Sequence, residues 1–177
     1  MIVDQDILCA LCRSAMWQQP CDLDLSPGIS DEQWQRIYMN SVRHGVLALA
    51  LDGVMRLPKE LQPGFNTRIK WGYNAEVIAK RYNAQKATAE KLAAIFAEKG
   101  IRTMVMKGIG LSLYYPLPRQ RPFGDIDIYL FDKFDEGNRI MSKYGCDVDG
   151  SYYRHYEFGF GGFNIENHSC FVETRIN

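Results

Sequence analysis

Two aspartates separated by a single residue are the best candidates for chemistry in this sequence. Asp125 and Asp127 alternate with Ile126, Ile128 and Leu130, and alternation with period two predicts a half-buried strand. Side chains at i and i+2 of a strand leave the same face, so the two carboxylates project together. Because like charges held close together repel, the pair favours a bound cation. Hard oxygen ligands favour Mg²⁺ or Mn²⁺, held together with the phosphates of a substrate.

A hairpin is predicted further along the chain. The dipeptide Gly161-Gly162 separates two runs rich in aromatic and β-branched residues, 152–160 and 163–168. A pair of glycines between such runs is typical of a tight β-turn. The two runs are therefore expected to pair as antiparallel strands.

The alternation within the second run predicts a third acid for the site. If Phe163 and Ile165 face the core, Glu166 faces the side assigned to the aspartates. A third carboxylate on a neighbouring strand would complete a site for one or two divalent ions, which activate a hydroxyl and neutralise a leaving pyrophosphate. We favour Glu166 for this role, with Glu157 and Glu173 as competitors.

A phosphate-binding turn is predicted before the aspartates. Lys107 and Gly108 lie where a strand is expected to pass into a helix, and backbone N–H groups at such a turn attract phosphate. Lys107 adds a positive charge and Ser112 a hydroxyl. Arg119 and Arg121 follow on a proline-rich loop, and Arg121 is the better candidate for a triphosphate contact. The alternatives are an ordinary turn for the glycines, and solvated charge or a salt bridge to the aspartates for the arginines.

Two histidines, His155 and His168, lie near the predicted acids. The sequence around them has no serine or cysteine at the spacing of a nucleophile. We interpret both histidines as structural groups or as partners that orient the acids.

The predicted elements place these residues in an α+β fold, with helices first and a small mixed sheet second. An N-terminal helical region is expected over residues 1–100 and a core over 101–177, in the order β-α-β-α-β-β. The helices expected in the first region cover 4–17, a segment capped by Ser30, and a long segment from Pro63 to Lys99. The elements expected in this order are strands 101–106, 125–130, 152–160 and 163–168, and helices 111–115 and 132–144, and residues 171–176 can form one more strand.

Composition restricts the class of protein. The chain has 177 residues, of which 46% are hydrophobic, and a formal net charge of zero. No overall basic field argues for nucleic acid as the main partner. The five cysteines are an odd number at irregular spacing, a pattern that indicates a protein of a reducing compartment. No apolar run resembles a signal peptide or a membrane span. We therefore expect a cytoplasmic protein with no membrane partner.

The residues around the aspartates carry a resemblance to a known family. Lys107-Gly108, Tyr114-Tyr115-Pro116, Arg121 and Gly124-Asp125-Ile126-Asp127 resemble the nucleotidyltransferase superfamily of DNA polymerase β type, and more narrowly a bacterial family of uncharacterised nucleotidyltransferases. The segment Ile165-Glu166-Asn167-His168 is similar to a later motif of that family.

The resemblance implies a function and roles for these residues. It implies Mg²⁺-dependent transfer of a nucleoside monophosphate from a nucleoside triphosphate (NTP) to an acceptor hydroxyl. Asp125 and Asp127 would be metal ligands and Glu166 the third acid, and the acceptor would be a protein, an RNA or a small molecule. This sequence differs from the family pattern in two ways. Lys107-Gly108 replaces the usual Gly-Ser, and relatives tend to carry more helical sequence after the third acid, so we expect a core that is truncated at its C-terminal end.

The alternative is an inactive nucleotide-binding or antitoxin-like interaction module on the same fold. Either the enzyme or the module could be oligomeric.

Overall fold

The computed structural model describes residues 3–25 and 28–171. By its internal contacts the chain forms two compact units. The first comprises residues 1–81 and 112–122, and the second comprises residues 82–111 and 123–177. The boundary expected at residue 100, between a helical domain and the α/β core, stays a prediction. None of the helices in the described residues is long and apolar enough to cross a membrane.

The first unit is helical. Its elements are α1 (Asp4–Trp17), α2 (Asp31–Arg43), α3 (Leu47–Met55), η1 (Lys59–Leu61), the first half of α4 (Phe65–Ala97) and η2 (Pro118–Gln120). Helix α2 begins as predicted, because the Ser30 hydroxyl accepts a hydrogen bond from the Gln33 backbone N–H at 3.2 Å. This bond satisfies one of the N–H groups that the first turn of a helix leaves unpaired.

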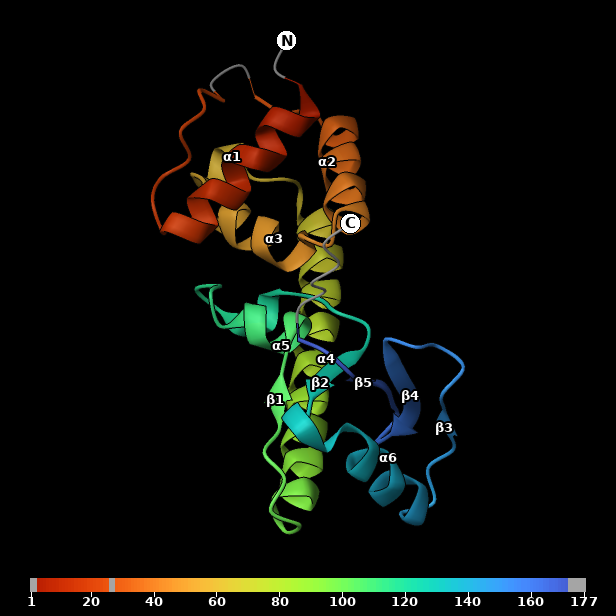
Figure 1. Cartoon of the computed structure of the whole chain (residues 1–177). Helices are drawn as coiled ribbons and strands as arrows, with labels where there is room; N and C mark the ends of the chain where they lie inside the picture. Colours follow the sequence, from red (N-terminus) through yellow and green to blue (C-terminus); the bar gives the residue numbers. More distant parts are fainter. Residues whose placement is uncertain (1–2, 26–27, 172–177) are drawn as a thin grey trace. The chain divides into compact units, whose positions relative to one another are not determined.

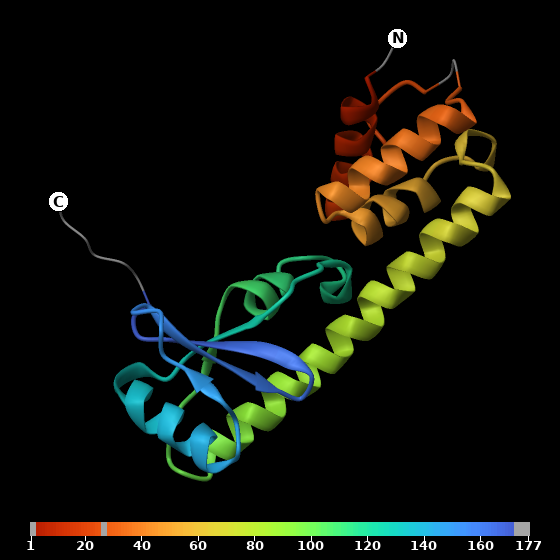
Figure 2. The ribbon, with the colours of Figure 1, turned by 90° about the vertical axis from the view of Figure 1, so that its right-hand side faces the viewer.

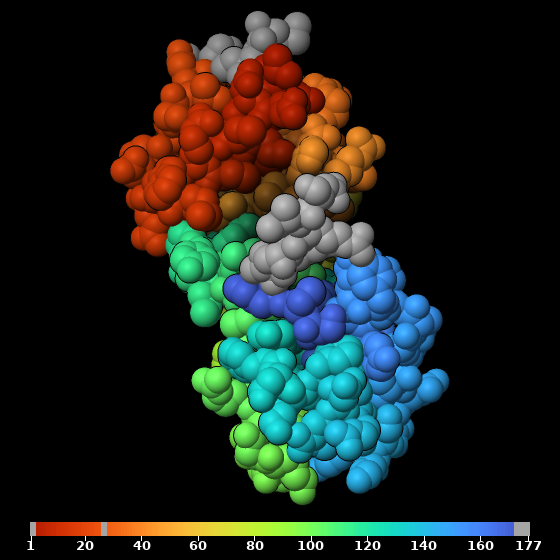
Figure 3. Space-filling view, viewed as in Figure 1, coloured from red at the N-terminus to blue at the C-terminus, as the bar shows by residue number. Residues whose placement is uncertain are grey.

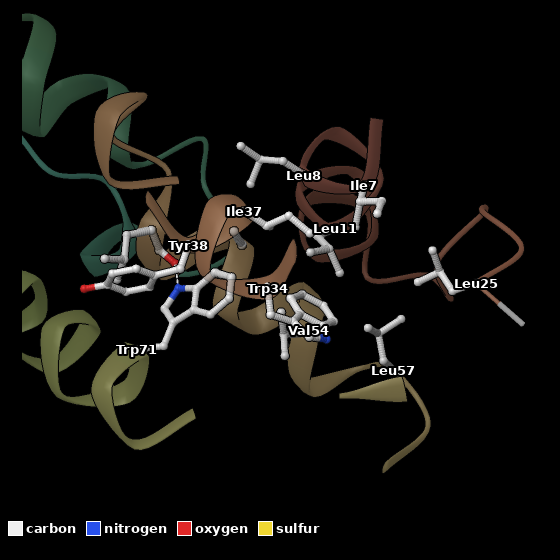
Figure 4. Close-up of a cluster of buried hydrophobic side chains, with 12 residues drawn as sticks. Ile7, Leu8, Leu11, Leu25, Trp34, Ile37, Tyr38, Val54, Leu57 and Trp71 are labelled. Atoms are coloured by element: carbon white, nitrogen blue, oxygen red, sulfur yellow. Dashed lines mark hydrogen bonds between the residues drawn. The ribbon is translucent and has the colours of Figure 1, made fainter. Parts of the chain in front are cut away.

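Apolar side chains from all four helices form the core of the first unit. Figure 4 shows Trp71 of α4 beside Tyr38 of α2, with its indole N–H donating to the Leu47 carbonyl oxygen at 2.8 Å. The rings of Tyr38 and Trp71 pack edge to face, with centroids 5.5 Å apart. Helices α1 and α3 approach closely at Gly53, where a Cβ atom would lie 2.2 Å from the Leu11 carbonyl oxygen. The close helix contact therefore depends on glycine at this position.

The second unit contains a five-stranded sheet and carries the predicted site. Its elements are the second half of α4, β1 (Met104–Val105), α5 (Lys107–Ser112), β2 (Ile126–Tyr129), η3 (Phe131–Lys133), α6 (Phe134–Lys143), β3 (Val148–Asp149), β4 (His155–Phe160) and β5 (Phe163–His168). The strand order is β1-β2-β5-β4-β3 (Figure 1). Strand β2 is parallel to β5 and antiparallel to β1, whereas β4 is antiparallel to β5. The sheet is therefore mixed, as the α+β prediction required.

Helices α4 and α6 cover one face of this sheet (Figure 2). The buried side chains on that face include Phe96 of α4, Met141 of α6 and Ile128 and Ile165 of the two central strands. Asn167 also points to α6, where its amide donates to Asn138 Oδ1 at 2.9 Å. Since side chains alternate along a strand, the residues next to these isoleucines project from the opposite face.

Several local predictions differ from the structure. The strand expected over 101–106 is only Met104–Val105, and the helix expected over 111–115 is instead α5, which begins at Lys107. The segment 148–149 forms an additional short strand, β3, that the predicted order lacked. Two-residue strands carry too little alternation to detect. The predicted strand 171–176 lies, except for its first residue, outside the described residues.

Candidate active site

The predicted acids come together on the face of the sheet opposite α4 and α6. In the parallel pair β2–β5, Asp127 lies directly opposite Glu166, and Ile126 opposite Ile165. One carboxylate oxygen from each of Asp125, Asp127 and Glu166 lies within 4.8 Å of the others. Strand pairing thus supplies the proximity that the alternation of the two strands only suggested.

Lys107 contacts the central aspartate. Its Nζ lies 2.6 Å from Asp127 Oδ1. The Asp127 side chain is 3% exposed and that of Lys107 is 59% exposed. Lys107 has a φ of 43°, a conformation uncommon for a residue other than glycine, and the neighbouring Met106 N–H donates to the Asp127 carbonyl oxygen at 2.9 Å. The backbone at the start of α5 thereby holds the ammonium group over the acids.

Two histidines complete the cluster. His168 Nε2 lies 2.9 Å from Asp127 Oδ1 and 3.3 Å from Glu166 Oε2. His155, which lies opposite His168 across the β4–β5 ladder, has its Nδ1 3.8 Å from Glu166 Oε2. His155 Nε2 lies 3.0 Å from Glu157 Oε1. Glu157 therefore contacts the side of His155 that faces away from Glu166, and Glu166 is the acid that faces the aspartates.

The environments of the acids shift their pKa values in opposite directions. Burial raises the pKa of Asp127, but hydrogen bonds with His168 and Lys107 outweigh it, and the pKa lies below its usual value. Burial also raises the pKa of Glu166, and repulsion from Asp125 and Asp127 adds to it, so this pKa lies above its usual value despite the two histidines. The hydrogen bond with Asp127 raises the pKa of Lys107. Asp127 is thus an ionised carboxylate paired with Lys107 and His168, while Glu166 takes up a proton more readily than Asp127.

A hollow of about 280 Å³ opens beside these groups. Its lining residues are Lys107, Tyr152, Arg154, His155, Glu166, His168, Cys170 and Phe171. Cys170 and Phe171 are exposed, and Figure 3 shows the dark blue end of the described chain at the surface beside the cyan segment of η3 and α6. Among the lining residues, Tyr152, Arg154, Cys170 and Phe171 were not predicted as site residues. A signal was available for Tyr152 and Arg154, since both precede His155 at the start of a strand that pairs with β5.

A larger hollow of about 700 Å³ lies in the first unit, between α1 and α2. It holds an ion pair in which Arg36 Nε lies 2.6 Å from Asp4 Oδ2. Among the described residues, no group of three metal-ligating atoms occurs there. The smaller hollow beside the acids is therefore the better candidate for an active site.

The other residues predicted for phosphate binding lie in α5 and in the segment that follows it. Gly108 lies in the first turn of α5, where a Cβ would lie 3.1 Å from Phe123 Cγ, so glycine allows the ring to pack there. Ser112, which is buried, and Arg121, which is half-buried, belong to the segment 112–122 of the first unit. Roles for these three in phosphate binding stay predictions. Glu173, a competitor for the third acid, lies outside the described residues.

The combination of a central D-x-D strand, a parallel strand carrying a third acid and a covering pair of helices is compatible with a nucleotidyltransferase core. The model of a family described as uncharacterised nucleotidyltransferases matches residues 30–176, which is most of the chain. The chain belongs to this family. Comparison with curated proteins and with solved structures finds no match.

Proposed function

We propose that the protein transfers a nucleoside monophosphate from an NTP to an acceptor hydroxyl, with Mg²⁺ or Mn²⁺ held by Asp125, Asp127 and Glu166. The observation that carries this proposal is the grouping of three carboxylates within 4.8 Å, with an ammonium nitrogen 2.6 Å from the central one. Clustered carboxylates of this kind attract a cation. The donor set consists of hard oxygens, which suit both ions.

The chemistry follows from these positions. The acceptor oxygen forms a bond to the α-phosphorus, the bond from that phosphorus to the oxygen that bridges to the β-phosphate breaks, and pyrophosphate leaves. A divalent ion bound by the acids would lower the pKa of the attacking hydroxyl and offset the charge of the pyrophosphate. Glu166 either helps to hold this ion or accepts the hydroxyl proton as a general base. Lys107 is placed to hold a phosphate oxygen once it leaves Asp127.

The acceptor is a protein, an RNA or a small molecule, and the assay must cover all three. The protein is incubated with α-labelled NTPs, Mg²⁺ or Mn²⁺, and each class of acceptor, and both labelled product and released pyrophosphate are measured. We expect Asp127→Asn to abolish transfer. Asp132→Asn, which removes an exposed acid in η3, is the matched control and should keep it. Transfer that persists in Asp127→Asn would contradict the proposal.

The alternative is a nucleotide-binding module without turnover, and one observation favours it. The Lys107 ammonium already pairs with Asp127 in the structure, so this aspartate does not require an ion to offset its charge. In that case an NTP would raise the melting temperature of the protein, while no acceptor would become labelled and no pyrophosphate would be released.

A further inference from the structure

A second group of metal-ligating atoms lies beside the three carboxylates. One ligand atom from each of His155, Glu166 and His168 lies within 4.8 Å of the others. All three side chains are at least four-fifths buried, with exposed fractions of 14%, 17% and 13%. They come from adjacent strands, since His155 of β4 lies opposite His168 of β5 and Glu166 precedes His168 by two residues on the same face.

Two of the three distances among these atoms are close to those between ligands of a single ion. Two ligands that are each about 2.1 Å from a tetrahedral ion lie roughly 3.4 Å apart. Glu166 Oε2 lies 3.3 Å from His168 Nε2 and 3.8 Å from His155 Nδ1. Small side-chain rotations would bring all three within bonding distance of one ion. Two histidines and one carboxylate leave a fourth position for water or substrate.

The outer contacts of His155 match those of a metal ligand. A ligating histidine usually has its second ring nitrogen bonded to a carboxylate or a carbonyl oxygen, which sets the tautomer and the ring orientation. His155 Nε2 lies 3.0 Å from Glu157 Oε1, and Glu157 Oε2 accepts a hydrogen bond from the Asn164 amide at 3.2 Å. This chain of contacts directs Nδ1 of His155 toward Glu166.

We propose that His155, Glu166 and His168 bind a second divalent ion of the transition-metal class, such as Mn²⁺, Co²⁺ or Zn²⁺. Imidazole is a good ligand for these ions, whereas Mg²⁺ prefers oxygen ligands. This site adjoins the all-oxygen site of Asp125 and Asp127: Glu166 reaches both, and His168 Nε2, which lies 2.9 Å from Asp127 Oδ1, must exchange that contact for the ion. A bridging role for Glu166 rests on the proposed function, but the two-histidine site does not.

Cobalt provides a test that does not depend on activity. The metal-stripped protein is titrated with Co²⁺ in excess Mg²⁺, and the strong visible absorption of four-coordinate Co²⁺ distinguishes a tetrahedral site from weakly absorbing octahedral coordination. We expect one Co²⁺ per chain that Mg²⁺ does not displace, an affinity at least about 10-fold lower in Glu157→Gln because the orienting carboxylate is altered, and loss of the spectrum in His155→Gln. The control is His44→Gln, which changes the third histidine of the chain, an exposed residue in the first unit.

The outcomes separate this proposal from the proposed function. Co²⁺ affinity and spectrum that are the same in the unaltered protein, His155→Gln and Glu157→Gln would overturn the two-histidine site, as would the absence of a saturable spectrum. Glu157→Gln keeps the test decisive if His155→Gln fails to fold. A histidine-dependent Co²⁺ spectrum without nucleotide transfer would contradict only the proposed function. Transfer with Mg²⁺ but without such a spectrum would contradict only the second ion.

Discussion

Replacement of Lys107 by methionine is expected to tighten the binding of a divalent ion to the acids. In the structure the Lys107 ammonium lies 2.6 Å from Asp127 Oδ1, an oxygen that an ion would also use. The ion must therefore displace the ammonium group. Methionine retains much of the length and the apolar stem of lysine but carries no charge, so the variant removes the competitor with little change in packing.

The size of the effect follows from the burial of the two partners. Asp127 is 3% exposed, but Lys107 is 59% exposed, so solvent screens much of the attraction. Exposed ion pairs contribute at most about 1 kcal/mol, and we take this upper value because one partner is buried. A change of 1.4 kcal/mol is about tenfold in affinity, so Lys107→Met should bind the ion roughly fivefold more tightly. The same variant should bind NTP more weakly at saturating metal, since Lys107 is expected to hold a phosphate.

The assay is a calorimetric titration of metal-stripped protein with Mn²⁺, followed by a titration with a non-hydrolysable NTP analogue. Lys133→Met is the matched control, because it makes the same change in net charge at an exposed lysine that pairs with Glu136 at 3.1 Å. We expect the control to leave both affinities close to those of the unaltered protein. Mn²⁺ affinity in Lys107→Met equal to or weaker than that of Lys133→Met would refute the competition argument.

Two further substitutions test the acids and the packing of the helices. Glu166→Gln should raise the melting temperature of the metal-free protein at pH 8 but not at pH 4. The pKa of Glu166 is raised in the folded state, so its stabilising contribution is complete below the unfolded pKa and is lost as the pH rises through the folded pKa. At pH 8 the neutral glutamine therefore replaces a carboxylate whose charge opposes folding. Equal melting temperatures of Glu166→Gln and the unaltered protein at pH 8 would contradict the raised pKa of Glu166. Gly53→Ala should destabilise the protein by about 1–3 kcal/mol or more in urea unfolding, because its Cβ would lie 2.2 Å from the Leu11 carbonyl oxygen. Gly72→Ala, whose Cβ would meet nothing within 4 Å in helix α4, should instead stabilise by roughly 0.5–1 kcal/mol, and a similar loss in both variants would exclude the packing explanation.

The local pattern of the sequence was enough to predict the central part of the fold. The run Phe163–His168 is a strand with the bounds predicted for it. Both residues of Gly161-Gly162 have positive φ values, 59° and 83°, as the tight turn between paired strands requires. The long helix from Phe65 to Ala97 agrees with the predicted helical segment before Gly100. These features depend on the spacing and the conformational preferences of neighbouring residues, which a sequence displays directly.

The order and direction of the strands in the sheet were harder to predict from the sequence. The sequence did not show that β1 would be antiparallel to β2, or that the brief segment Val148–Asp149 would extend the sheet beyond β4. Short strands are stabilised by the neighbours with which they pair rather than by their own pattern. Their presence is therefore decided by contacts between segments that are distant along the chain.

The sequence by itself determined which side chains share a face. Alternation placed Asp125 with Asp127, and Glu166 with His168, because successive residues of a strand point to opposite sides. Only the tertiary structure decided which faces meet and in which register: Asp127 opposite Glu166, His155 opposite His168, and the Lys107 ammonium on Asp127. Register is a property of two segments and of the core that both must cover, so neither segment carries it alone.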